Sequence, residues 1–164
     1  MKMLAILLVL TGFFLPMSQV HQKASPQIFY ADSAKIGDVY AGMRLTSIDY
    51  NLETNDVTAQ FEGETTLTGT FTRFSEDHEF FSGILFTVDP ESTNNLPLLA
   101  SDERESRGFI LENENQDELL AMLGNPDYAA EGRATIVIKD YRLNHQHKEI
   151  MDTAILVKVV NLME

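Results

Sequence analysis

Two histidines near the C-terminal end have the spacing of a possible metal site. His145 and His147 are separated by one residue, so an extended backbone would place both imidazoles on the same side. Imidazole nitrogen is a good ligand for Zn²⁺ or Cu²⁺, and a carboxylate from Glu149 or Asp152 could supply a third ligand. The spacing specifies no fourth ligand, and paired histidines are also typical of a solvated polar turn. Both interpretations stay open, and the pattern by itself assigns no cofactor.

Acidic side chains are abundant, but they form no recognisable reaction motif. None of the acidic clusters has the spacing of an EF-hand loop, so a Ca²⁺ site and a solvated acidic surface are both open. The chain contains no Gly-x-Ser-x-Gly, Ser-x-x-Lys, Gly-x-Gly-x-x-Gly or Walker motif. Two carboxylates could still serve glycoside hydrolysis if folding brought them together. The residue types therefore favour binding over catalysis, with a paired-carboxylate hydrolase as the alternative.

The composition limits the class of protein. The chain has 164 residues, of which 44% are hydrophobic, and this is enough to bury one ordinary core. It carries 25 Asp and Glu against 12 Lys and Arg, a formal net charge of −13, which repels phosphate backbones and anionic membrane surfaces. The absence of Cys excludes a disulfide scaffold, a thiol nucleophile and a cysteine metal site. We therefore expect no nucleic-acid partner.

The first 24 residues have the pattern of a secretory signal peptide. Lys2 gives a positively charged start, and the apolar run 4–15 is too short for a spanning helix. We expect cleavage near Ala24, which would leave no membrane span, and an uncleaved anchor is the alternative. An exported chain without cysteine suits a bacterial protein that is secreted or held in the cell envelope.

After the leader, apolar and polar residues mostly alternate, which is typical of half-buried strands. We expect residues 25–35 to be a linker or a loosely attached N-terminal arm, and residues 36–164 to form one domain. A tight turn is predicted at Gly63, and shifts in the alternation near Gly42 and Asp140 predict bulges. The predicted strands cover about residues 36–50, 57–62, 66–72, 79–88, 106–112, 132–143 and 153–162.

One short helix is predicted at about residues 116–123. Asn115 and Glu118 have capping-box spacing at its start, and Gly124 stands where the helix should end. Long bulged strands favour a barrel, because bulges allow a sheet to curve and closure removes its edges. We therefore expect an all-β domain with one short helix, folded as an antiparallel closed or partly open barrel that resembles an elaborated OB-type barrel. A two-sheet β-sandwich is the alternative.

The contact regions are predicted from loops. Residues 90–104 show no periodicity, and long loops in compact domains are usually functional. Leu96, Leu98 and Leu99 in this loop must either pack back on the barrel or await a partner, and we take them as candidate ligand-binding residues. The connection 144–152 is the second candidate region. Several aromatic residues have no evident core position and could form a platform for sugars or peptides: Phe29, Tyr30, Tyr40, Phe74, Phe81 and Tyr128, of which Tyr128 is the candidate ligand-binding residue.

These patterns favour a non-enzymatic binding or interaction module outside the cytoplasm. Its partner would be an unidentified protein or another envelope or extracellular ligand. Two alternatives belong to other classes: a small exported hydrolase that uses paired carboxylates, and a structural accessory of an envelope complex. The sequence predicts neither the ligand nor the oligomeric state.

Overall fold

The computed structural model describes residues 27–74, 83–112, 121, 129–146 and 151–163, and strands account for nearly all of their regular structure. The all-β prediction is therefore confirmed. Most of the predicted helix at 116–123 lies outside the described residues, in the connection between the seventh and eighth strands. The elements are β1 (Ile28–Phe29), β2 (Val39–Tyr40), β3 (Met43–Asn51), β4 (Asp56–Phe74), β5 (Gly83–Val88), η1 (Thr93–Asn95), β6 (Leu98–Leu99), β7 (Arg107–Leu111), β8 (Ala129–His145) and β9 (Asp152–Met163).

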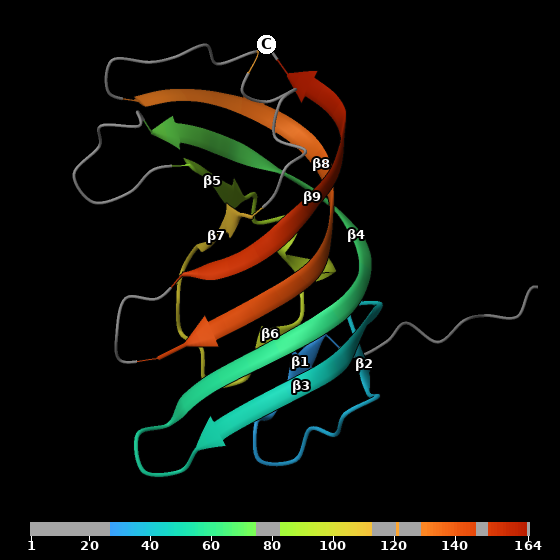
Figure 1. The fold of residues 1–164 in the computed structure, drawn as a ribbon, viewed down its shortest axis with the longest axis vertical. Coiled ribbons are helices and arrows are strands. Elements are labelled where there is room, and N and C mark those ends of the chain that lie inside the picture. The colour runs from blue at the N-terminus through green and yellow to red at the C-terminus, as the bar shows by residue number, and fades with distance from the viewer. Residues whose placement is uncertain (1–26, 75–82, 113–120, 122–128, 147–150, 164) are drawn as a thin grey trace, which may run out of the picture.

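A ring of five strands is built on the long pair β4 and β8 (Figure 1). These strands pair in antiparallel fashion along almost their whole length, from Val57 opposite His145 to Phe74 opposite Ala129. The other edge of β4 carries β3 along its first half and β5 along its second half. The ring then runs from β5 to β7, β9 and back to β8. The pairing of β4 with β8 therefore makes the sheet ring-like.

The ring is a mixed sheet that contains one parallel pair of strands. Within the ring, the first strand (β4) pairs with the second (β5) and the fourth (β8), and the third (β7) runs parallel to the fifth (β9). The sheet is therefore mixed at β7 and β9, whereas the sequence pattern predicts a wholly antiparallel barrel. Alternation of apolar and polar residues does not reveal whether a strand pairs in parallel or antiparallel fashion, because side chains alternate between the two faces in both kinds of sheet. β1, β2, β3 and β6 are additions to the ring.

The bulge predicted at Asp140 is confirmed, but the predicted turn at Gly63 is wrong. β4 continues through Gly63, whose φ of +120° accompanies a register shift between β4 and β8. Asp140 has a φ of +51° where β8 shifts register against β9. β8 pairs with β4 on both sides of Gly63. The irregularity at Gly63 is therefore a bulge within β4, and the chain does not reverse there.

The shift near Gly42 marks a hairpin instead of a bend within one long strand. Tyr40 pairs with Met43, which leaves Ala41 and Gly42 as a two-residue turn with φ angles of +49° and +81°. Positive φ at both positions is typical of a type I′ turn. A bulge does occur further along β3, between Leu45 and Ser47.

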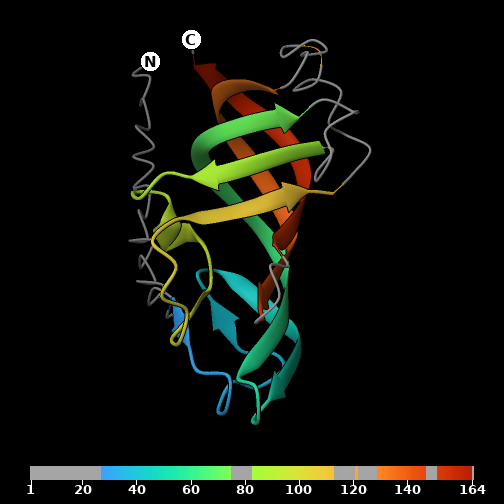
Figure 2. The ribbon, with the colours of Figure 1, turned by 90° about the vertical axis from the view of Figure 1, so that its left-hand side faces the viewer.

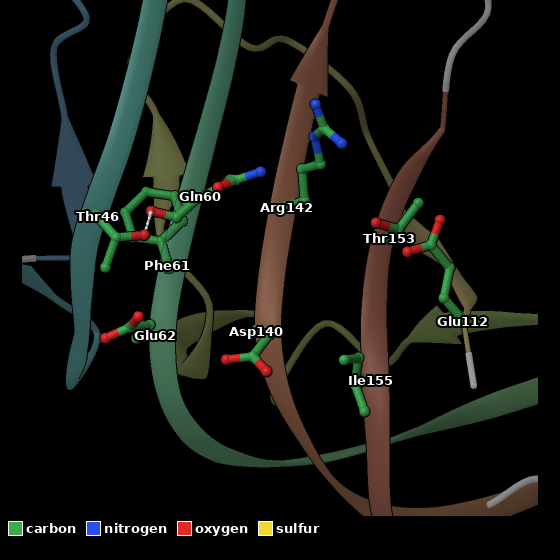
Figure 3. Close-up of a pocket in the computed structure, with 9 residues that line it drawn as sticks. All are labelled: Thr46, Gln60, Phe61, Glu62, Glu112, Asp140, Arg142, Thr153 and Ile155. Carbon is green, nitrogen blue, oxygen red and sulfur yellow. Dashed lines mark hydrogen bonds between the residues drawn. The ribbon is translucent and has the colours of Figure 1, made fainter. Parts of the chain in front are cut away.

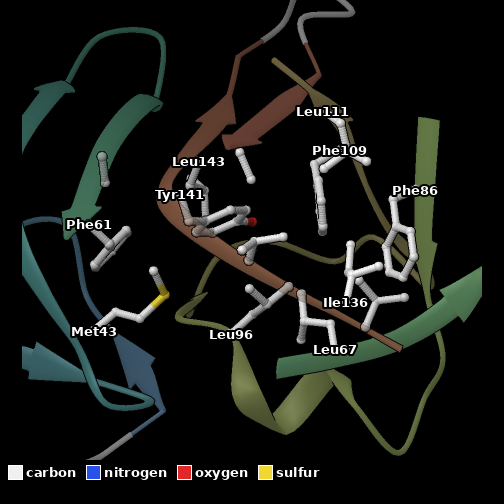
Figure 4. Close-up of a cluster of buried hydrophobic side chains, with 14 of the residues drawn as sticks. Met43, Phe61, Leu67, Phe86, Leu96, Phe109, Leu111, Ile136, Tyr141 and Leu143 are labelled. Carbon is white, nitrogen blue, oxygen red and sulfur yellow. The ribbon is translucent and has the colours of Figure 1, made fainter. Parts of the chain in front are cut away.

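A continuous apolar core fills the interior (Figure 4). Tyr141 lies at its middle, with ring centroids 6.3 Å from Phe61 and 6.2 Å from Phe109. Alternate residues of β4, β5, β7 and β8 point inward, as period-two patterning requires. The structure also assigns Phe29 and Tyr40 to this core, although their sequence positions suggest no core partner.

The described part of the N-terminal arm is firmly attached to the domain. β1 pairs in parallel with β6, and Phe29 is only 1% exposed. The Phe29 ring lies 5.4 Å from the rings of both Tyr40 and Phe61. Figure 2 shows this arm beside the segment that contains β6. Loose attachment of the arm is therefore wrong for Phe29, because burial of its ring outweighs the weak local pattern. No helix within the described ranges is long and apolar enough to cross a membrane.

Candidate functional site

Two hollows that share Asn55 lie where four segments of the chain meet. The first has a volume of about 180 Å³ and lies between the arm, the β3–β4 turn and the segment after β6. The second has a volume of about 270 Å³ and joins that turn to the end of β8. We call this surface the tyrosine end. Its lining residues are Tyr30, Ala31, Asp32, Tyr50, Asn55, Leu99, Ala100 and Ser101 in the first hollow and Asn55, Asp56, His145 and Gln146 in the second.

The β3–β4 turn holds Asn55 between the hollows. Asn55 has a φ of +58°, a left-handed conformation that asparagine tolerates better than most residues. Its Oδ1 accepts a hydrogen bond from Tyr50 Oη at 3.3 Å. Within the turn, Asn51 Oδ1 accepts from the backbone N–H of Glu53 at 2.9 Å, and Thr54 Oγ1 donates to Asp56 Oδ2 at 2.7 Å. These bonds hold the turn in one geometry.

A buried ionic network begins at the residue that follows the first hollow's Ser101. Asp102 follows Ser101, and its side chain is completely buried. Arg104 Nε donates to both carboxylate oxygens of Asp102 at 2.9 Å. Arg107 also donates to this carboxylate, and its Nη2 bonds the Asp102 backbone carbonyl at 3.1 Å. The Asp102 carboxylate thereby holds Arg104 and Arg107, and with them the segment between β6 and β7, in one conformation.

The network continues from Arg104 to β8 and β9 through Asp152, which is 1% exposed. Asp152 accepts hydrogen bonds from Tyr141 Oη at 2.6 Å and from the backbone N–H of Asn144 at 2.8 Å. Arg104 Nη2 donates to Asp152 Oδ2 at 3.1 Å. The same side chains therefore hold the 99–107 segment and the end of β8 in fixed relative positions.

The charges of this network balance, since two carboxylates face two guanidinium groups. Burial alone would raise the pKa of Asp102, but hydrogen bonds and charge from Arg104, with the charge of Arg107, hold it below its usual value. Burial and the neighbouring Asp152 charge raise the pKa of the Tyr141 hydroxyl well above its ordinary value. His145 Nδ1 lies 3.9 Å from Asp102 Oδ1, so the network reaches the edge of the second hollow.

A third hollow, of about 280 Å³, lies on the outer face of the sheet (Figure 3). We call it the acidic hollow, because Glu62, Glu112 and Asp140 line it from three different segments. The bulges in β4 and β8 place Glu62 and Asp140 there, and all three carboxylates are exposed. The other lining residues are Thr46, Gln60, Phe61, Arg142, Thr153 and Ile155.

Comparison with known proteins adds nothing to this geometry. No relative is found. No protein-family model matches the chain, and no curated protein or solved structure is detectably similar to it.

The structure places the predicted ligand-binding leucines mostly inside the domain. Leu96 is fully buried and Leu99 is 3% exposed, whereas Leu98 is half-buried. The leucines of the 90–104 loop therefore pack back on the barrel, which is the alternative interpretation of this loop. Leu96 lines neither hollow of the tyrosine end, whereas Leu99 lines the first hollow despite its low exposure. Tyr128 lies outside the described residues.

The predicted metal site is described only at His145. His147 and Glu149 lie outside the described residues, so their position relative to His145 stays a prediction. Among the residues that the structure does describe, no group of three or more His, Cys, Asp or Glu side chains is arranged to hold a metal ion. His145 instead lies beside Asn55 and Gln146 in the second hollow.

The two predicted contact regions both reach the tyrosine end: the 90–104 loop supplies Leu99, Ala100 and Ser101, and the connection 144–152 supplies His145 and Gln146. Sequence reasoning misses the contribution of the β3–β4 turn. Tyr30 is a candidate platform residue, but the sequence pattern places Tyr50 on a strand face and gives Asn55 no role. An Asn between two alternating segments is a turn signal, yet it does not indicate which other segments approach the turn. The participation of Asp102 in a buried network has no local signal, because the network extends through Arg104 to Asp152 on a distant strand.

Proposed function

We propose that this protein is an exported, non-catalytic binding module whose ligand surface is the tyrosine end. The observation that carries the proposal is the pair of hollows joined at Asn55 and bordered by Tyr30 and Tyr50. Concave sites that combine aromatic surface with a few positioned polar groups are typical of ligand binding. Export follows from the predicted signal peptide.

The arrangement of carboxylates supports binding over hydrolysis. A paired-carboxylate hydrolase needs two acids in a cleft, one of them desolvated so that it can act as a general acid. Asp102 and Asp152 are desolvated, but both are bound to Arg104 and neither lines the hollows described above. Glu62 and Asp140 line a hollow, but they are exposed. Neither pair combines the two requirements.

The distribution of exposed apolar side chains also favours this part of the molecule. Five of the six large exposed hydrophobic side chains in the described ranges belong to residues 28–52. The strands among these residues, β1, β2 and β3, form the lower part of the domain in Figure 1. The sixth, Val160, belongs to β9. Tyr30, at 62% exposure, belongs to both this set and the first hollow.

Hydrogen exchange of the purified exported protein, with and without extract of the producing cell's envelope, tests the proposal. Exchange should slow in residues 30–32, 50–56, 99–101 and 145–146 when extract is added. The double variant Tyr30→Ala/Tyr50→Ala should lose this protection, and the matched control Val160→Ala should keep it. Protection that is absent, lies elsewhere or survives in the double variant would contradict the proposal.

A further inference from the structure

We infer that the ligand of the tyrosine end is a neutral, linear oligosaccharide. This inference rests on the proposed function, and it names the class of ligand that the lining residues fit. Three features support it: the aromatic surface, the kind of polar groups, and the division of the site into two small hollows that share Asn55.

The aromatic surface is suited to the apolar face of a sugar ring. Tyr30 is 62% exposed, and Tyr50 is half-buried against the core while its ring borders the same hollow. An aromatic ring offers a flat apolar surface with a defined orientation and loses little conformational entropy on binding. A pyranose ring presents C–H groups on its faces and hydroxyl groups around its rim, so it can pack on such a surface while its rim stays hydrogen-bonded.

The polar lining groups match hydroxyl groups better than they match charges. Asn55 and Gln146 each carry both a donor and an acceptor, and the Ser101 hydroxyl can act as either. A sugar hydroxyl also donates and accepts, so each of these groups can serve either role toward it. Planar amides and hydroxyls placed at the rim of an aromatic surface therefore suit a polyhydroxylated ligand.

The charges of the site disfavour an anionic ligand. Of the residues described around the two hollows, none is Lys or Arg, and Asp32 and Asp56 carry negative charge. The nearby guanidinium groups of Arg104 and Arg107 are already bound to Asp102. The net charge of −13 adds to the repulsion of polyanions. A neutral polymer meets no such electrostatic repulsion.

The dimensions of the site indicate a ligand made of small linked units. Neither hollow, at about 180 and 270 Å³, reaches the volume of roughly 300 to 1,000 Å³ that is usual for one drug-sized ligand. The hollows share the lining residue Asn55, so they adjoin each other. A linear oligosaccharide can place one ring in each hollow, with Asn55 between them.

Titration calorimetry with defined hexasaccharides tests the inference. The neutral probes are the β-1,4-linked hexamers of glucose and of N-acetylglucosamine and the α-1,4-linked hexamer of glucose. The charged probes of equal length are the hexamers of galacturonic acid and of glucosamine. At least one neutral hexamer should bind, at least tenfold more tightly than its monosaccharide and than the anionic hexamer.

Variants show whether binding occurs at the tyrosine end. Tyr30→Ala should weaken the best neutral probe about three- to tenfold, as expected for loss of one aromatic contact. Val160→Ala, a matched exposed position on β9, should bind as the parent does, and equal unfolding curves will establish that both variants are folded. Equal weakening by the two variants, or none by Tyr30→Ala, would overturn the inference.

The outcomes distinguish this inference from the function on which it depends. If no neutral hexamer binds, or if a charged hexamer binds best, the ligand class is wrong. Should envelope extract still protect the tyrosine end from exchange in that case, the binding function stands with a different ligand. Absence of both oligosaccharide binding and protection would reject both.

Discussion

Arg104 joins Asp102 to Asp152, with its Nη2 atom 2.6 Å from Asp102 Oδ2 and 3.1 Å from Asp152 Oδ2. One guanidinium thereby connects the segment after β6 to the first residue of β9. Buried ion pairs contribute little net stability compared with apolar packing, but removing one partner is costly because it leaves the other charge uncompensated. The network is therefore a positional constraint on the tyrosine end.

Replacement of Asp152 should show this cost. Asp152→Ala removes the acceptor for Tyr141 Oη and one of the two carboxylates that bind Arg104, so the free energy of unfolding should fall by about 3 to 5 kcal/mol. Asp49→Ala, which removes an exposed carboxylate on β3, should change it by less than about 0.5 kcal/mol. Urea unfolding measures both, and a loss below about 1 kcal/mol in Asp152→Ala would refute the constraint.

Acid should weaken the domain through Asp102. Burial alone would raise its pKa, but Arg104 and Arg107 hold the folded-state pKa below the value of about 3.9 for an unfolded chain. Stability from this carboxylate is therefore present above about pH 4 and is lost as pH falls through the folded-state pKa. Unfolding free energies measured from pH 7 down to pH 2 should decline less steeply below pH 4 in Asp102→Asn than in the parent. An unchanged acid slope would contradict the assignment, and Asp49→Asn is the control.

Alkali should weaken the domain through Tyr141. Burial and then the Asp152 charge raise the pKa of this hydroxyl in the folded state above the unfolded value of about 10. Its contribution is fully present below pH 10 and is lost as pH rises through the higher folded-state pKa. Tyr141→Phe should lower the free energy of unfolding by about 1.5 to 3 kcal/mol at pH 7. It should also make the loss of this free energy above pH 10 smaller than in the parent. Tyr30→Phe, at an exposed position, should change neither property.

The N-terminal arm supplies a direct test of its own packing. Phe29→Ala removes a ring that is buried against Tyr40 and Phe61. The free energy of unfolding should therefore fall by about 3 to 5 kcal/mol. The neighbouring Ile28→Ala is a matched control, because Ile28 is 52% exposed. A similar small effect of both substitutions on the urea midpoint would mean that the arm does not contribute to the core.

Two glycines on the ring strands should respond differently to alanine. A Cβ at Gly69 would overlap the carbonyl oxygen of Thr87 and lie 2.8 Å from the ring of Phe86, so backbone must shift. Gly69→Ala should therefore cost about 1 to 3 kcal/mol or more. Gly108→Ala meets nothing closer than 3.5 Å, at Leu85, and should be tolerated. Thermal unfolding compares the two, and equal stability of both variants would contradict the close approach of β4 and β5.

The sequence alone determined the class of fold, because each half-buried strand has a recognisable pattern within its own residues. Alternation of apolar and polar residues follows from one buried and one exposed face, and it is visible without knowing the neighbouring strand. The shift in this alternation at Asp140 likewise disclosed a real bulge. Composition alone also carries information, because it is the same for any fold that the chain could adopt. The absence of Cys excludes disulfides and thiol chemistry, and the excess of acidic residues disfavours binding to nucleic acid.

Pairing and the candidate site were decided only by the tertiary structure. Val57 and His145 are opposite each other across β4 and β8, and Arg104 reaches Asp152, although neither pair is close in sequence. Pairing of β4 with β8 on both sides of Gly63 also explains why the chain does not turn there. Local hydrophobicity fixes which face of a strand is buried, but it does not specify the strand alongside. That choice depends on the combined packing and hydrogen bonding of distant segments, which also bring Tyr30, Asn55 and His145 to one end of the domain.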